Sequence, residues 1–406
     1  MTPKGINVLF QKKVQAVSVI LLLSGLAGCG GNDVEVAATP APTPAPAPAP
    51  APAPVTLSEA ATLTATQEVA ETASLATGSA TLSMTTVSGA ITGSVTTTGL
   101  NATAAHIHLG AAGVNGPVIV GLVADPATAG KWNVPANAVL NKEQQDAYVA
   151  GNLYYNVHSA AFPGGEIRGQ IGREVALARL SGVQEVDQNA STAVGLGVIA
   201  FDPDTKQADV TLTFRDLLPA AAHIHTAAIG ANGPVTFPLG SPIATTYTLS
   251  KVALTDAQIA DFRAKRMYFN IHTSSFPGGE IRGQIGYQVR IGSMSGAQEN
   301  PSVTTTSTGR GFFAYDPETK NAFGQLTVSG FTPVAGHIHR GAVGVNGPVV
   351  LGFRQDPVVP QRWATNGLVP LADADALLFM SGGGYLNAHS VLFPGGEVRG
   401  QLGPNR

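Results

Sequence analysis

The chain is poor in cysteine and in charged residues. Its 406 residues include one cysteine, Cys29, and only 12% Asp, Glu, Lys and Arg. A single cysteine excludes a disulfide within the chain, so its stability must come from packed cores. Gly, Ala, Thr and Val are abundant instead. This composition favours β-structure with many turns and argues against a helical bundle.

Basic residues are also scarce, and they do not cluster. Residues 1–28 contain three lysines and no acid. Without them, 20 Lys and Arg face 26 Asp and Glu, a net charge of −6. Nucleic-acid binding depends on a basic surface that neutralises phosphates, so we expect no nucleic-acid partner.

The sequence lacks the common catalytic motifs. It has no G-x-S-x-G elbow, no phosphate-binding loop and no cysteine outside the N-terminal region. The repeated motif described below carries one glutamate and no second acid close to it, which argues against a glycosidase, because that chemistry needs two carboxyl groups.

The N-terminus has the pattern of a secretion signal. Lys12 and Lys13 precede a short apolar run at 14–23, which is too short for a typical membrane span. The Leu-Ala-Gly-Cys sequence ending at Cys29 resembles the bacterial lipobox. That resemblance implies cleavage after residue 28 and lipidation of Cys29, and Gly30 at the next position implies the outer membrane of a Gram-negative cell. The alternative is an ordinary secretory signal with a chance cysteine.

Residues 29–54 are expected to be a tether. Between Pro40 and Pro54, proline alternates with Ala or Thr. Such a sequence cannot form a core and favours an extended polyproline II conformation. We therefore predict a signal peptide at 1–28 and a lipidated, proline-rich linker at 29–54.

The remainder consists of three repeats. The motif F-P-G-G-E-[IV]-R-G-Q-[IL]-G occurs at 162–172, 276–286 and 393–403, and each copy follows an H-I-H triplet. A Gln-Glu pair opens each repeat, 39 residues before the first histidine of the triplet. A period of about 115 residues is right for an independent domain, so we predict domains at 55–173, 174–287 and 288–406.

Each repeat is predicted to be an antiparallel β-sandwich with one short helix, which makes the chain all-β. Strand-like alternation occurs at 211–214 and 325–328, and the turn sequences D-P-D-T-K (202–206) and D-P-E-T-K (316–320) separate strand-like runs as hairpin turns. Residues 141–150 and 254–264 have helical patterns, and the third repeat has a shorter version broken by Gly382 to Gly384.

The nine histidines occupy equivalent positions in the three repeats. In a strand, residues i and i+2 share a face, so His106 and His108 point the same way, close enough for two imidazoles to reach one metal ion. A later histidine, His158, lies eight residues before the motif glutamate. The full candidate set is His106, His108, His158; His223, His225, His272; and His337, His339, His389.

Other polar residues share the faces of these histidines in the predicted strands. Asn156 precedes His158 by two positions, and Glu166 and Arg168 alternate with buried isoleucines in the motif. The predicted polar cluster comprises Asn156, Glu166, Arg168; Asn270, Glu280, Arg282; and Asn387, Glu397, Arg399.

Two interpretations of the histidines remain open. In one, each trio binds copper or zinc, with the motif glutamate as a ligand or a supporting group. In the other, the histidines hydrogen-bond to Asn and to loop carbonyls in a structural or ligand-binding polar cluster. The H-x-H pattern is similar to that of copper–zinc superoxide dismutase, but the other ligands and the disulfide of that family are missing.

The motifs together resemble the CHRD domain, the repeat first described in chordin. The similarity covers the Gln-Glu opening, A-A-H-I-H with its N-G-P loop, N-V-H-S and F-P-G-G-E-I-R-G-Q-I, in three copies. It implies a secreted, β-rich binding module. We therefore expect a lipid-anchored, non-catalytic binding or adhesion protein with a protein or polysaccharide ligand. The alternative is a metal-binding protein or a metal-dependent enzyme.

The anchor prediction can be tested with Cys29→Ser in a Gram-negative host. Without the thiol there is nothing to acylate, so the variant should leave the membrane fraction and incorporate no labelled fatty acid. Membrane-bound, unlabelled Cys29→Ser protein would contradict the prediction.

Overall fold

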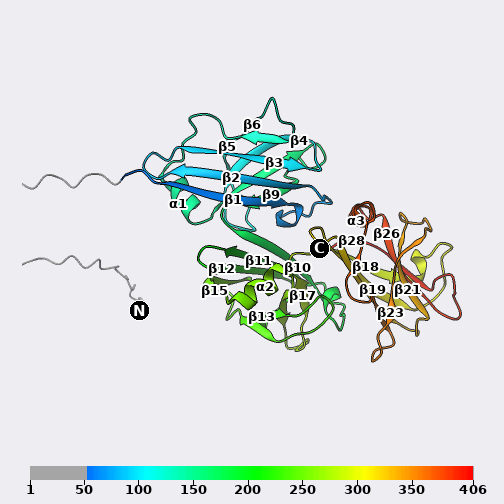
Figure 1. Ribbon diagram of the computed structural model, residues 1–406. Coiled ribbons are helices and arrows are strands. Elements are labelled where there is room, and N and C mark those ends of the chain that lie inside the picture. Colours follow the sequence, from blue (N-terminus) through cyan, green and yellow to red (C-terminus); the bar gives the residue numbers. More distant parts are fainter. Residues whose placement is uncertain (1–52, 406) are drawn as a thin grey trace, which may run out of the picture. The chain divides into compact units, whose positions relative to one another are not determined.

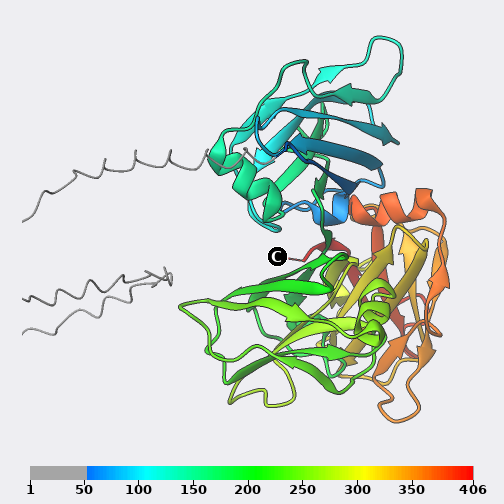
Figure 2. The same ribbon diagram turned by 60° about the vertical axis from the view of Figure 1, so that its left-hand side comes forward.

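The computed structural model describes residues 53–405 (Figures 1 and 2). The predicted signal peptide, Cys29 and nearly all of the proline-rich tether therefore lie outside the described residues. Among residues 53–405, no helix is long and apolar enough to cross a membrane. The described residues group as one compact unit by their internal contacts.

The strands and helices follow the three repeats along the chain. The first repeat contains β1 (Thr56–Thr64), η1 (Ala65–Gln67), β2 (Thr77–Thr85), β3 (Ile91–Thr98), β4 (Ala102–Leu109), β5 (Val118–Gly121), β6 (Val123–Ala124), β7 (Lys131–Asn133), α1 (Lys142–Val149), β8 (Leu153–Ser159) and β9 (Ile167–Gln170). The second contains β10 (Glu174–Ser181), η2 (Gly182–Gln184), β11 (Val194–Asp202), β12 (Gln207–Arg215), β13 (Ala221–Thr226), β14 (Val235–Pro238), β15 (Thr246–Ala253), α2 (Asp256–Arg263), β16 (Met267–His272) and β17 (Ile281–Gln284). The third contains β18 (Gln288–Ser295), η3 (Gly296–Gln298), β19 (Thr308–Asp316), β20 (Asn321–Ser329), β21 (Ala335–Arg340), β22 (Val349–Gly352), β23 (Arg354–Gln355), β24 (Arg362–Ala364), β25 (Val369–Pro370), α3 (Asp373–Met380), β26 (Gly384–His389), β27 (Val398–Gln401) and β28 (Gly403–Pro404).

Each repeat forms its own antiparallel sheet with the same strand order. The order is β5-β4-β8-β9-β1-β2-β3-β7-β6 in the first repeat, β14-β13-β16-β17-β10-β11-β12-β15 in the second and β22-β21-β26-β27-β18-β19-β20-β24-β23 in the third. The sheet curls into a near-barrel around its core. The prediction of three antiparallel β domains with one short helix each is confirmed. In the third domain two short strands lie beside this path, where β25 pairs with β20 and β28 pairs with β18.

Local sequence explains the turns and helices. In the turn between β11 and β12, the Asp202 Oδ1 atom accepts hydrogen bonds from the backbone N–H groups of Asp204 (3.0 Å) and Thr205 (3.1 Å). The hairpins predicted from D-P-D-T-K and D-P-E-T-K are therefore present.

Capping residues mark the first turns of the first two helices. Asn141 and Thr255 each form a capping box at the start of α1 and α2. The third helix has eight residues, like the other two. The expectation of a shorter helix there was wrong, because Gly382 to Gly384 follow α3 and do not interrupt it.

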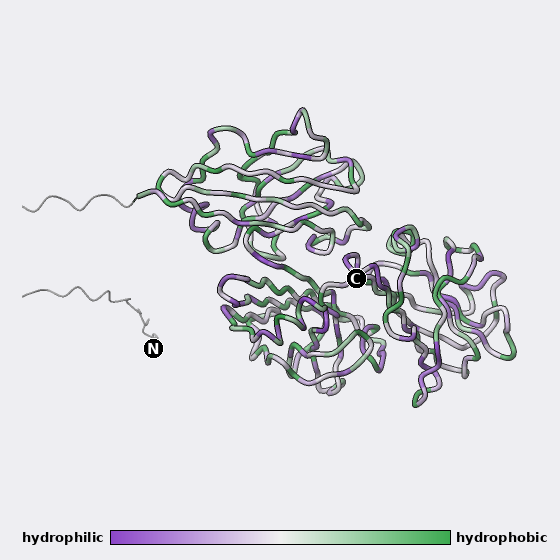
Figure 3. The backbone as a smooth tube through the Cα atoms, in the orientation of Figure 1, coloured by the Kyte–Doolittle hydropathy of each residue, from purple (hydrophilic) through white to green (hydrophobic). Residues whose placement is uncertain are grey.

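Alternation along the central strands separates a buried core from a polar face. Ile107, Val157 and Ile167 are 0% exposed, and they pack in the core cluster of the first domain. Hydrophobic and hydrophilic stretches are both distributed over all three domains (Figure 3). The other face of β4, β8 and β9 carries the polar residues of the repeated motifs.

Candidate metal centre

Strand register places the motif residues side by side on one face of the sheet. His106 on β4 pairs with Asn156 on β8, which in turn pairs with Arg168 on β9. The next row on the same face consists of His108, Tyr154 and Gln170. Since neighbouring strands carry directly opposed side chains on one face, these rows form a continuous polar surface.

The structure brings the three histidines of every repeat together. In each domain, one nitrogen from each imidazole lies within 4.8 Å of the other two. The three groups are His106, His108, His158; His223, His225, His272; and His337, His339, His389. Among residues 53–405, these groups contain no carboxylate, so Glu166 and its counterparts are not part of them.

Backbone carbonyls fix which nitrogen of two histidines is free. The His108 Nδ1 atom is 2.9 Å from the Gly116 carbonyl oxygen, and the His158 Nδ1 atom is 3.0 Å from the Pro163 carbonyl oxygen. A carbonyl can only accept, so both Nδ1 atoms carry the hydrogen and both Nε2 atoms carry a lone pair.

The same two bonds recur in the other domains. The equivalent partners are Gly233 for His225, Pro277 for His272, Gly347 for His339 and Pro394 for His389. A carbonyl on the far nitrogen is the usual support for a histidine that binds a metal.

The remaining histidine contributes its Nδ1 atom. The His106 Nδ1 atom lies 3.0 Å from the His158 Nε2 atom, and the corresponding distance between His337 and His389 is 3.2 Å. In the second domain, the converging atoms are His223 Nδ1, His225 Nε2 and His272 Nε2, and all three are buried without a hydrogen-bond partner. Unpartnered buried nitrogens are costly, so the second trio fits a bound cation, and the first and third trios each have one such nitrogen, His108 Nε2 and His339 Nε2.

The surroundings disfavour the charged form of both histidines in each H-I-H triplet. Burial lowers the pKa of His106 and His108, and the neighbouring histidines lower both further. In the third domain, burial and the adjacent histidines lower the pKa of His337 to about 4. A metal ion binds the neutral imidazole, so the local electrostatics favour coordination at neutral pH.

A tyrosine that the sequence reasoning missed orients the buried histidine. The Tyr154 ring stacks on the His108 ring with centroids 4.8 Å apart and planes 12° from parallel. Its hydroxyl accepts a hydrogen bond from the Gly116 N–H (3.0 Å), so Gly116 is bound through both its N–H and its carbonyl. Tyr268 and Tyr385 occupy the same position. The recurring Y-x-N-x-H alternation in the sequence could have revealed them.

The predicted arginine holds the loop over this stack. The Arg168 guanidinium lies 3.5 Å from the centre of the Tyr154 ring and is almost fully buried, with 1% exposure. It donates to the carbonyl oxygens of Ala111 (2.8 Å) and Val114 (2.9 Å). Arg282 and Arg399 repeat this position over Tyr268 and Tyr385. The arginine therefore secures the loop that carries the Gly116 carbonyl.

The motif glutamates are buried away from the histidine nitrogens. The Glu166 Oε1 atom accepts a hydrogen bond from the Ser74 hydroxyl (2.7 Å). Glu280 accepts from Ser191 and Thr273, and Glu397 accepts from Ser307 and Thr305. Each carboxylate thus anchors the segment that follows the Gln-Glu pair of its own repeat.

A second glutamate in each repeat, the one in the Gln-Glu pair, was not predicted as part of the site. Burial raises the pKa of Glu68 to about 7, although the Arg168 guanidinium and the Asn156 amide favour its charged form. The same cause raises the pKa of Glu185 to about 8 and that of Glu299 to about 7. The predicted Asn156, Asn270 and Asn387 lie beside these three carboxyl groups, so they belong to this buried layer of the polar face. The constant spacing between the Gln-Glu pair and the H-I-H triplet in the three repeats could have indicated that this glutamate belongs to the site.

The second glycine of the motif covers this glutamate–asparagine pair. Gly165 has a φ of +128°, and a Cβ atom there would lie 2.6 Å from Asn156 Oδ1 and 2.9 Å from Glu68 Oε1. Gly279 and Gly396 have the same surroundings. Only glycine fits, both because of the backbone conformation and because of the close approach.

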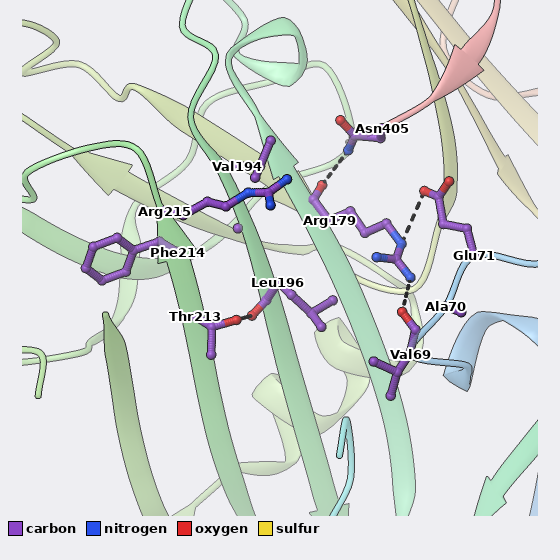
Figure 4. Close-up of a pocket in the computed structure, with 11 residues that line it drawn as sticks. Val69, Ala70, Glu71, Arg179, Val194, Leu196, Thr213, Phe214, Arg215 and Asn405 are labelled. Carbon is purple, nitrogen blue, oxygen red and sulfur yellow. Dashed lines mark hydrogen bonds and ion pairs between the residues drawn. The ribbon is translucent and has the colours of Figure 1, made fainter. Parts of the chain in front are cut away.

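A separate pocket is lined by Arg179 and Glu71, which form an ion pair. The Arg179 side chain points toward Glu71 and the Val69 carbonyl (Figure 4). These contacts are 3.2 Å from Arg179 Nε to Glu71 Oε1 and 2.6 Å from Arg179 Nη2 to the Val69 oxygen. The paired charges argue for a structural role, so the histidine clusters remain the candidate site.

Gly165→Ala should destabilise the first domain by about 2–4 kcal/mol, from backbone strain and overpacking. Gly164→Ala is the matched control, because a Cβ atom there meets nothing within 4 Å. It should change the free energy of unfolding by less than about 0.5 kcal/mol. Chemical denaturation measures both, and equal losses would contradict the packing described for Gly165.

The stability of the Glu68→Gln variant relative to wild type should increase as the pH rises. A carboxyl with a raised pKa takes up a proton on folding, so its stabilising contribution is full below about pH 4.5 and is lost by about pH 7. Glutamine mimics the protonated acid at every pH. Relative to wild type, the free energy of unfolding of the variant should rise by on the order of 3 kcal/mol between pH 4.5 and pH 8.

Urea denaturation at pH 4.5, 6 and 8 measures this difference. Glu185→Gln should show the same trend extended toward pH 8, because the pKa of Glu185 is raised to about 8. A difference that stays constant with pH would contradict the prediction.

Comparison with known proteins agrees with the repeated motifs. The CHRD domain model matches residues 60–171, 177–285 and 292–402, which together make up most of the chain. A search of the curated proteins and a search of the solved structures each found no match. With three tandem matches, one to each domain of the fold, the chain belongs to the CHRD domain family.

Proposed function

We propose that each CHRD domain of this chain is a metal-binding module that holds one copper or zinc ion. The observation that carries this proposal is the convergence of three imidazole nitrogens in every domain, within 4.8 Å of one another. In the second domain none of these three nitrogens has a hydrogen-bond partner.

The donor set suits these two metals. Imidazole nitrogen is a good ligand for zinc and copper, whereas magnesium and calcium prefer oxygen ligands. Three protein ligands also match the number found at zinc sites that keep an open position. The His108 Nε2 and His158 Nε2 atoms would hold the ion together with His106 Nδ1, and the carbonyls of Gly116 and Pro163 would keep the first two rings in place.

Metal binding requires one rearrangement in the first and third domains. Without metal, His106 Nδ1 donates to His158 Nε2, because the hydrogen of His158 is already on Nδ1. For His106 Nδ1 and His158 Nε2 both to bind an ion, His106 would have to carry its hydrogen on Nε2 instead of Nδ1. Moving the hydrogen from Nδ1 to Nε2 leaves the His106 imidazole neutral, so the net charge of the protein does not change.

The signal-peptide and lipobox pattern at the N-terminus supports a location of these modules in the cell envelope. We propose that Cys29 is lipidated and that residues 29–54 display the domains at a membrane surface, in the cell envelope. A binding or adhesion role without catalysis is compatible with three such modules in tandem, which could engage a repeating protein or polysaccharide ligand with increased avidity.

The metal proposal predicts three ions per chain. Purified protein loaded with zinc or copper and then freed of excess metal should hold close to three equivalents by elemental analysis. His158→Ala should lower the content by about one equivalent, because the first domain then keeps only two imidazoles. The loaded wild-type protein should also unfold at a higher temperature than the metal-free protein.

Glu143→Ala is the control, since it removes an exposed carboxylate from α1 and leaves all nine histidines in place. The Glu143→Ala protein should retain three equivalents of metal per chain. Folded wild-type protein that binds less than one equivalent, or an unchanged metal content in His158→Ala, would overturn the proposal. Circular dichroism confirms that each variant is folded.

A further inference from the structure

The charge around each histidine trio has one sign. Apart from the other histidines, Arg168 is the ionisable side chain that acts on His108, and no carboxylate acts on His106 or His108. Arg282 and Arg399 have the same relation to His225 and His339. Among the described residues, no Asp or Glu oxygen belongs to a trio.

The nearest motif carboxylates are engaged elsewhere. Glu166 accepts the Ser74 hydrogen bond, and Glu68 lies in the buried layer with Asn156 under Gly165. Neither carboxylate therefore supplies a negative ligand to an ion held by the three imidazoles.

Two of the three histidines in the first trio are partly exposed. His108 is 9% exposed, whereas His106 and His158 are only partly buried. An ion bound to three nitrogens here would be covered by protein on the sheet side, and an external ligand would approach it past His106 and His158.

We propose that the open position of each metal centre takes a small inorganic anion from solution. This inference rests on the proposed metal binding. Three neutral imidazoles leave a divalent ion with its full double charge, and the nearby guanidinium adds positive potential. Among the described residues, no carboxylate belongs to a trio to neutralise this charge, so a small anion completes the coordination better than a neutral ligand.

Azide is a suitable probe, because its binding to Cu²⁺ produces a visible charge-transfer absorption and changes the electron paramagnetic resonance spectrum. The protein is loaded with Cu²⁺, freed of excess metal and analysed for copper per chain before azide is added. Saturable spectral changes should follow, with about one azide per bound copper. Acetamide, a small neutral ligand, should leave the spectra unchanged at the same concentrations.

The outcomes separate the two proposals. If copper is bound at about three equivalents and azide leaves both spectra unchanged at 100-fold excess, the anion site is wrong while metal binding stands. If copper is not retained, the metal proposal itself fails, and the anion inference fails with it. If acetamide perturbs the spectra as strongly as azide, the open position has no preference for anions and the inference is overturned.

His158→Ala provides an internal check on the location. The first domain then lacks one metal ligand, so the number of azides bound per chain should fall together with the copper content, by about one third. An unchanged azide count in this variant would place the azide sites away from the histidine clusters.

Discussion

The hydrogen bond from His108 Nδ1 to the Gly116 carbonyl is the contact on which the site depends. It joins a strand residue to the loop that follows that strand, and it decides which nitrogen of the imidazole is free. The loop itself is held by Arg168, which bonds to its carbonyls from the opposite end of the polar face. Tyr154 lies between the two side chains as a shared packing surface. The orientation of one imidazole is therefore supported by three strands and a loop.

The same arrangement recurs with nearly the same geometry in all three domains. The imidazole–tyrosine stack has centroid distances of 4.8, 4.9 and 4.9 Å in the three domains, and the guanidinium–ring distance is 3.5 Å in each. The domains differ elsewhere, for example in the residues after the triplet, where Thr226 and Ala227 replace the Leu-Gly and Arg-Gly of the other copies. Holding three imidazoles at fixed positions accounts for the common features better than fold stability alone, because buried unpartnered nitrogens are a cost to stability.

The sequence predicted the parts of the site that depend on strand periodicity. H-I-H, N-x-H and R-G-Q each alternate with core residues, so the facing of His106, Asn156 and Arg168 follows from a period of two. The contacts of Glu166 and Glu68 could not be predicted in this way. Ser74 and Glu68 lie in the segment around and after η1, which has no period of its own, and more than 90 residues separate Ser74 from Glu166. Such contacts are fixed by the closing of the sheet, where β1 pairs with β9, and not by local pattern.

The most direct test of this account is the tautomeric state of the nine histidines in the metal-free protein, measured by long-range proton–nitrogen NMR on histidine-labelled protein at neutral pH. The structure predicts that six of them carry the hydrogen on Nδ1 and have an unprotonated Nε2, namely His108, His158, His225, His272, His339 and His389. Addition of zinc should then shift the Nε2 resonances of these six. Hydrogen on Nε2 in most of them, or Nε2 resonances that do not respond to zinc, would contradict the account.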